Sequence, residues 1–184
     1  MKKAIDWVAL AVGLALALFD QLQPLHGLGP ADRELLACAA LLHDLGLSVE
    51  LAGHHKHSLR LILHGDLPTL TTAERSVVAH VARYHRKTCP KPTHRAFAAL
   101  PVEAQERVRR LAAILRVADG LDRAHEHAVA RLAAVQAAPG QWTVEVHGPG
   151  DLGFAAWGAE RKSDLFREAY AAAIQFEPRG DAAS

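Results

Sequence analysis

Apolar residues recur with helical spacing along most of this chain. Val108, Leu111, Ala112 and Leu115, for example, fall at i, i+3, i+4 and i+7, which is the spacing of one buried helix face. Clusters of proline and glycine interrupt the pattern and mark turns. The pattern predicts helices over residues 5–22, 30–45, 56–64, 72–85 and 101–123.

The helix expected at residues 30–45 is central to the prediction, because its apolar residues surround almost the whole helix. A helix that is apolar all round is buried, yet this one carries His43 and Asp44 near its end. A lone buried carboxylate is costly unless it is paired or bound to a metal ion. We therefore expect a partner or a metal at this pair. We also expect a helix stop at Gly46, since glycine tolerates the left-handed conformation found just past helix ends.

The pattern changes in the last third of the chain. Helical propensity continues over residues 124–138, and an alternation of apolar and polar residues then predicts a strand at 142–146. Further segments are a second strand at 154–157, an amphipathic helix at 162–173 and a strand at 174–176. The predicted fold is mostly α, with a helical domain at residues 1–138 followed by a small α/β appendage with a polar tail at 139–184.

The charges of the chain are unevenly distributed. The net charge is +1, but residues 83–131 hold eleven Lys and Arg against five Asp and Glu. Such a basic segment favours an anionic ligand or partner. The alternative is a set of solvated helix faces whose arginines pair with acids at i,i+4 spacing.

The cysteines and the N-terminus bear on the compartment. Cys38 and Cys89 form no CxxC or zinc-like spacing, so no disulfide framework is predicted, which fits a reducing cytoplasm. The apolar run at residues 7–19 imitates a signal peptide, but it is too short for a bilayer, which takes about 20 residues. We expect a buried first helix and no membrane span.

Several polar residues are candidates for a site. His43, Asp44 and a distant aspartate, Asp119, could hold a divalent ion, and imidazole with carboxylate suits Mn, Fe, Co, Ni, Zn or Mg. A metal so held could activate a nucleophile and clamp a phosphoryl oxygen. The catalytic candidates are Asp44, His57 and His85, and the anion-binding candidates are Arg83, His85, Arg86 and Lys87.

Structural alternatives stand beside each of these assignments. His43 and Asp44 could form a buried hydrogen-bonded pair without metal, and Asp119 could form a salt bridge with Arg116 or Arg123. His57 and His85 could be surface or capping residues. The other histidines are expected in loops, as for His54 and His55, or on the surface, as for His26 and His80.

The motifs around these residues resemble a known family. An apolar helix ending in HD, followed by a distant VADGLD, is similar to the HD superfamily of metal-dependent phosphohydrolases. More narrowly, the chain resembles the C-terminal half of bacterial exopolyphosphatases and guanosine pentaphosphate phosphohydrolases. The motifs that carry this resemblance are LLHDLG, GHHKHS, GDLP, ARYHRK, RRLAAILRVADGLDR, VEVHGPGDL and AERKSDLF. The resemblance covers residues 5–176 and implies an HD-type helical bundle.

Two departures from the family pattern affect what the resemblance implies. The HD pattern takes its first metal ligand from a histidine on the first helix, and the matching region around Trp7 has none. The family enzymes also carry an actin-like catalytic domain ahead of this region, and we expect this chain to stand without one or to work with one that is separately encoded. The space between the helices is therefore expected to be either an open polar site or one filled by Trp7.

The resemblance implies a stand-alone HD-like domain that binds polyphosphate or another phosphate-rich anion, or that mediates dimerisation. It would work with or without a separately encoded actin-like catalytic domain. The alternative is an autonomous phosphohydrolase that acts on a phosphoester or phosphoanhydride through His43, Asp44 and Asp119. The expected partners are polyphosphate or a phosphorylated small molecule and a second copy of the chain, with no membrane and no specific nucleic acid. The expected location is the cytoplasm.

Overall fold

A computed structural model describes residues 2–123 and 127–180, with side chains from residue 9 onward in the first helix. The side chain of Trp7 lies outside the described residues. The elements, in chain order, are helices α1 (Lys2–Gln21), α2 (Gln23–His26) and α3 (Pro30–Leu42), a 3-10 turn η1 (Leu45–Ser48), helices α4 (His54–His64), α5 (Thr72–Arg83), α6 (Arg95–Ala98) and α7 (Val102–Leu121), strands β1 (Arg131–Ala138) and β2 (Gln141–Gly148), helices α8 (Leu152–Glu160) and α9 (Asp164–Tyr170), and strand β3 (Ala173–Gly180).

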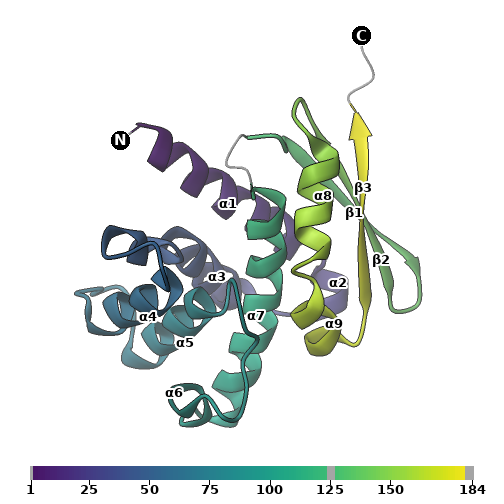
Figure 1. The fold of residues 1–184 in the computed structure, drawn as a ribbon. Coiled ribbons are helices and arrows are strands. Elements are labelled where there is room, and N and C mark those ends of the chain that lie inside the picture. The colour runs from purple at the N-terminus through teal and green to yellow at the C-terminus, as the bar shows by residue number, and fades with distance from the viewer. Residues whose placement is uncertain (1, 124–126, 181–184) are drawn as a thin grey trace.

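Helix α7 is the central element of the structure (Figure 1). Helices α1, α3 and α5 pack against it on one side, and α4 packs on α5, while α8 and α9 pack on its other side. Leu111, Ile114 and Leu115 of α7 are fully buried in this core. The long apolar stripe that predicted a helix here is therefore the surface on which both halves of the molecule assemble.

The sheet has the order β1-β2-β3, with β1 antiparallel and β3 parallel to β2. Parallel neighbours require a crossover connection, and α8 and α9 supply it between β2 and β3. These two helices lie between the sheet and α7 (Figure 1). Alternate residues of β2, namely Trp142, Val144 and Val146, are buried beneath them.

Helix α1 packs into this core and also forms hydrogen bonds with the edge strand β1. Leu14, Leu18 and Phe19 of α1 are buried. At the end of α1 the Gln21 amide donates to the Leu132 carbonyl at 3.0 Å and accepts from the Ala134 amide at 2.7 Å. The side chain thus satisfies backbone groups on the free edge of β1, where an unpaired edge could recruit another chain. Among the described residues, no helix is long and apolar enough to cross a membrane.

Two segments differ from their predicted structure. Residues 131–138 form a strand, because pairing with β2 across the Pro139-Gly140 turn outweighs the helix propensity of an alanine-rich segment. Residues 154–157 lie in helix α8, whose first turn is capped by Asp151, which accepts from the Phe154 amide at 2.9 Å. The mostly α fold with a small α/β appendage is confirmed. The division into domains at residue 138 stays a prediction, and the β1–β2 hairpin spans that position.

Candidate functional site

His43 and Asp44 lie in the turn after α3, because the helix ends at Leu42, earlier than predicted. Gly46 does not adopt a left-handed conformation there. It is needed instead for close packing, since a Cβ at this position would overlap the His54 carbonyl and lie 2.6 Å from the Ser58 amide nitrogen. The Ser58 hydroxyl accepts from the Gly46 amide at 2.9 Å and donates to the His43 carbonyl at 2.6 Å. Helix α4 thus fixes the shape of the turn.

Three buried histidines have the same backbone anchor. Nδ1 lies 2.7 Å from the Ala40 carbonyl in His43, 2.7 Å from the Ala82 carbonyl in His85 and 3.2 Å from the Leu51 carbonyl in His54. A carbonyl only accepts, so each Nδ1 carries the hydrogen and Nε2 is the atom presented to the site. A histidine that ligates a metal ion is usually oriented in this way.

These Nε2 atoms converge on the carboxylate of Asp44. Its Oδ1 lies 2.9 Å from His54 and 3.5 Å from His85, and its Oδ2 lies 3.5 Å from His43. Oδ1 is buried, and it accepts no hydrogen bond of good geometry from the described residues. His43, Asp44 and His85 each offer one ligand atom, and these atoms all lie within 4.8 Å of one another. A divalent ion would satisfy this group.

Asp119 lies next to the group on α7. Its Oδ1 is 3.9 Å from His43 Nε2, and its Oδ2 forms an ion pair with Lys162. Burial acts to raise the pKa of Asp119, but the charge of Lys162, with smaller contributions from His85 and His43, outweighs it and holds the pKa well below its usual range. Burial also lowers the pKa of His85, which keeps that imidazole neutral. Asp119 thus forms its salt bridge with Lys162 and not with Arg116, which instead pairs with Asp164 at 2.8 Å.

A pocket of about 540 Å³ opens over these residues. Its basic residues come from three separate parts of the chain, namely the loop after α5, the second half of α7 with its following turn, and the end of α8. The lining residues are Asp44, Leu47, Leu51, His54, His85, Arg86, Lys87, Arg116, Asp119, Arg123, Arg161 and Lys162. The carboxylates of Asp44 and Asp119 thus face an open, positively charged space.

The structure brings together most, but not all, of the residues that the sequence singled out. His85, Arg86 and Lys87 line the pocket. Arg83 is not among the lining residues, and its guanidinium lies over the Tyr84 ring at 5.4 Å. Burial lowers the pKa of Arg83. His57 also lies outside the pocket lining, with Nε2 3.7 Å from Glu50 Oε2.

Other residues were missed or misplaced by the sequence analysis. His54 and His55 are buried at the start of α4 rather than in a loop, and His26 and His80 are buried rather than on the surface. His54 in particular contacts the site: its Nε2 lies 3.3 Å from Arg86 Nη1 as well as close to Asp44. The signal for it was the position of GHHKHS directly after the HD turn.

Arg123, Arg161 and Lys162 were not predicted as site residues. Both arginines lie against the Trp157 ring, at 5.3 Å for Arg123 and 5.2 Å for Arg161. Arg161 and Lys162 lie within AERKSDLF, a motif that was recognised without a role for its basic residues. The fold brings these residues to the pocket by packing α8 on α7, a contact that helical periodicity does not predict.

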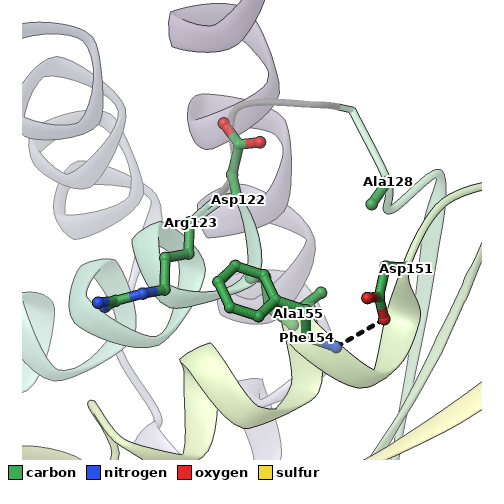
Figure 2. Close-up of a pocket in the computed structure, with 7 residues that line it drawn as sticks. Asp122, Arg123, Ala128, Asp151, Phe154 and Ala155 are labelled. Atoms are coloured by element: carbon green, nitrogen blue, oxygen red, sulfur yellow. Dashed lines mark hydrogen bonds between the residues drawn. The ribbon is translucent and has the colours of Figure 1, made fainter.

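A second cavity, of about 400 Å³, lies beside the first and shares Arg123 with it (Figure 2). Its other described lining residues are Leu121, Asp122, Ala128, Asp151, Phe154 and Ala155. Figure 2 shows the Phe154 ring between the loop that carries Asp122 and the capping residue Asp151. The two cavities are thus neighbours along one side of α7 and α8.

The chain is similar in sequence to known proteins. Over 83 residues the chain is 36% identical to the guanosine-5'-triphosphate,3'-diphosphate pyrophosphatase of Pseudoalteromonas translucida, covering 44% of this chain and 17% of that protein. It is 32% identical over 102 residues to the protein of the same name from Photobacterium profundum, covering 55% of this chain and 20% of that protein. The matches thus span about a fifth of these relatives. The sequence profile described as "Ppx/GppA phosphatase, domain III" matches residues 9–148, and the chain therefore belongs to this family.

Proposed function

We propose that this chain binds a phosphate-rich anion, either polyphosphate or a phosphorylated small molecule, in the basic pocket above a divalent metal ion held by His43, Asp44 and His85. The observation that carries the proposal is the convergence of two backbone-anchored imidazoles on the Asp44 carboxylate beneath a pocket lined by six Lys and Arg residues. The kinship with the HD superfamily remains part of the proposal.

The charges of the pocket support an anionic ligand. Arg86, Lys87, Arg123, Arg161 and Lys162 line it together with the buried Arg116, which is already paired with Asp164. Guanidinium groups match the oxygens of phosphate in a bidentate way, and lysine adds a mobile point charge. Several phosphates in one ligand would use such dispersed charges better than a single phosphate would.

The donor set supports a transition metal. Two imidazole nitrogens with one carboxylate suit Zn, Fe, Ni or Co, and carboxylates also accept Mn and Mg. Asp44 Oδ1 is buried and accepts no hydrogen bond of good geometry from the part of the chain that the structure describes, which fits a metal ligand. When bound, the ion would supply Lewis-acid polarisation of a phosphoryl oxygen. Asp44, His43 and His85 would hold it, while Arg86 and Lys87 bind the outer oxygens of the anion.

The first test is binding of tripolyphosphate, measured by calorimetry at low and high NaCl concentration. The double variant Arg86→Gln, Lys87→Gln is expected to lose about tenfold or more in affinity, because charge-assisted hydrogen bonds contribute roughly 1.5–3 kcal/mol each. Arg131→Gln, which removes an exposed charge on β1, serves as the matched control and is expected to change affinity less than about twofold. Equal affinity of the pocket variant and the control contradicts the proposed anion site.

A second candidate function is hydrolysis of a phosphoester or phosphoanhydride. It is favoured by the exposure of two carboxylates to the pocket. The Asp44 and Asp119 carboxylates both line the pocket, so a bound phosphoryl group could reach the metal ligands. The test is phosphate release from a panel of phosphoesters and polyphosphate with added Mn²⁺ or Ni²⁺. Asp44→Asn is expected to abolish turnover while leaving the fold intact. Turnover that survives this substitution would exclude Asp44 as a catalytic residue.

The wider assembly is also a proposal. Because the matched segments cover only 17% and 20% of the two relatives, we propose that this domain works beside an actin-like catalytic domain or as a homodimer. Light scattering on the purified chain tests the dimer, for which a monomer at micromolar concentration is the contradicting result. Its location in the cytoplasm stays a prediction.

A further inference from the structure

Lys162 connects the C-terminal part of the chain to the candidate metal group. It follows α8, and its backbone amide donates to the Ala159 carbonyl at 3.0 Å. One helical turn earlier, Gly158 packs so closely on Gly120 of α7 that a Cβ at either position would overlap the other backbone. The contact between α7 and α8 therefore fixes Lys162 beside Asp119, the residue that precedes Gly120.

The ion pair of Asp119 and Lys162 uses the carboxylate that the sequence predicts as a metal ligand. Asp119 Oδ2 binds the ammonium group, and Oδ1 stays 3.9 Å from His43 Nε2. The compact group of possible ligand atoms contains His43, Asp44 and His85 without Asp119. Both members of the ion pair are largely buried, so water screens their charges only weakly.

A divalent ion ligated by Asp119 would lie about 2 Å from its carboxylate oxygen. An ammonium group on the same carboxylate would then face the ion at short range, and two cations repel each other there. Lysine can leave, because its charge sits on a flexible four-carbon stem. Arg161, the neighbouring cation, is held against the Trp157 ring instead.

We propose that Lys162 competes with the divalent ion for Asp119 and, once displaced, binds the phosphate anion in the pocket. The charge of Asp119 is neutralised in both states. Lys162 does so in one state, and the metal ion does so in the other, in which the anion pairs with the freed lysine. Lys162 lines the same pocket, so its ammonium group is within the space that the anion would occupy. This inference rests on the proposed metal and anion sites. It adds Asp119 as a further ligand of the ion and couples the two sites.

Linkage gives the coupling a measurable form. If metal frees Lys162 for the anion, the metal raises anion affinity, and the anion must raise metal affinity by the same factor. Replacing Lys162 with an uncharged side chain removes both the competitor and the anion contact. Metal affinity alone should then rise, and the coupling should shrink.

The experiment is calorimetric titration of MnCl₂ into the metal-free protein at fixed pH, with and without sulfate as a tetrahedral anion that leaves Mn²⁺ in solution. Lys162→Met is expected to bind Mn²⁺ roughly tenfold more tightly than the unmodified protein in the absence of sulfate. Sulfate should tighten Mn²⁺ binding in the unmodified protein and have a smaller effect in Lys162→Met. Arg131→Met removes an equal charge at an exposed position on β1, outside the pocket lining, and its Mn²⁺ affinity should change by no more than about twofold.

The outcomes separate this inference from the proposed function. If Lys162→Met and Arg131→Met bind Mn²⁺ equally, or if Lys162→Met binds it more weakly, the competition by Lys162 is overturned while the metal site stands. If none of the three proteins binds Mn²⁺, Co²⁺ or Zn²⁺, the metal site fails and the inference fails with it. Circular dichroism establishes folding, and Lys162→Gln replaces Lys162→Met should the latter not fold.

Discussion

Ser58 controls the geometry of the candidate site although it contacts no proposed ligand. Its hydroxyl bridges the Gly46 amide and the His43 carbonyl, so it fixes the turn between α3 and η1. The side chain is fully buried. Both backbone groups would lose this hydrogen bond if the hydroxyl were removed, and His43 and Asp44 would lose their fixed orientation.

We expect Ser58→Ala to destabilise the protein by about 1–3 kcal/mol, because it removes two buried hydrogen bonds to the backbone. Metal affinity should fall as well, because the ligand atoms are no longer preorganised. Ser48→Ala is the matched control, since the Ser48 hydroxyl donates to the Leu45 carbonyl in an exposed part of the same turn. Urea denaturation and Mn²⁺ titration measure the two effects, and equal stability of the two variants contradicts this role of Ser58.

At the scale of elements, the contact between α7 and α8 joins the two parts of the site. Gly120 and Gly158 allow the backbones of these helices to touch. Helix α7 carries Asp119, and the segment that follows α8 carries Arg161 and Lys162. A change in the distance between the helices therefore changes the position of the Asp119 carboxylate relative to Arg161 and Lys162.

We expect Gly158→Ala to lower the free energy of unfolding by about 1–3 kcal/mol, because the added methyl group overlaps the Gly120 carbonyl and overpacks the interface. Gly153→Ala, also in α8, adds a methyl group whose nearest neighbour is Asp151 Oδ1 at an ordinary 3.4 Å. This control should be neutral or stabilising by up to about 1 kcal/mol, as alanine is the better helix former. A more stable Gly158→Ala protein would show that the two helices can separate without cost.

At the scale of the whole molecule, buried neutral histidines link the fold to pH. Burial lowers the pKa of His80 below its ordinary value of 6.5; a hydrogen bond to the Ser76 carbonyl opposes the shift and the nearby charge of Arg83 adds to it. Burial likewise lowers the pKa of His26. When the pH falls below about 6.5, the unfolded chain takes up protons that these side chains in the folded protein do not.

The protein is therefore expected to lose stability as the pH falls from about 6.5, with a slope of up to about 1.4 kcal/mol per pH unit for each such histidine. His80→Asn should show a shallower loss over the same range. The cost of the substitution itself is read at pH 8, where the imidazole is neutral in both states. Denaturation curves at pH 8, 7, 6 and 5 provide the measurement, and identical slopes for the two proteins would contradict the prediction.

The sequence by itself determined the helical bundle, because periodic apolar residues can be buried in only one way on a helix. It also singled out His43, Asp44, His85, Arg86 and Lys87 as candidates, since a carboxylate in an apolar segment and a basic loop both need partners. The pattern placed His85 at the end of a helix, but it did not predict that His85 lies close to Asp44.

Only the tertiary structure decided the rest. Strand β1 exists because β2 pairs with it, and the C-terminal cations reach Asp119 because α8 crosses between the sheet and α7. Helical spacing describes which residues share a face of one element and carries no information on which elements meet. The partner of Asp119 was thus undecided from the sequence, and it is a lysine 43 residues away rather than a neighbouring arginine.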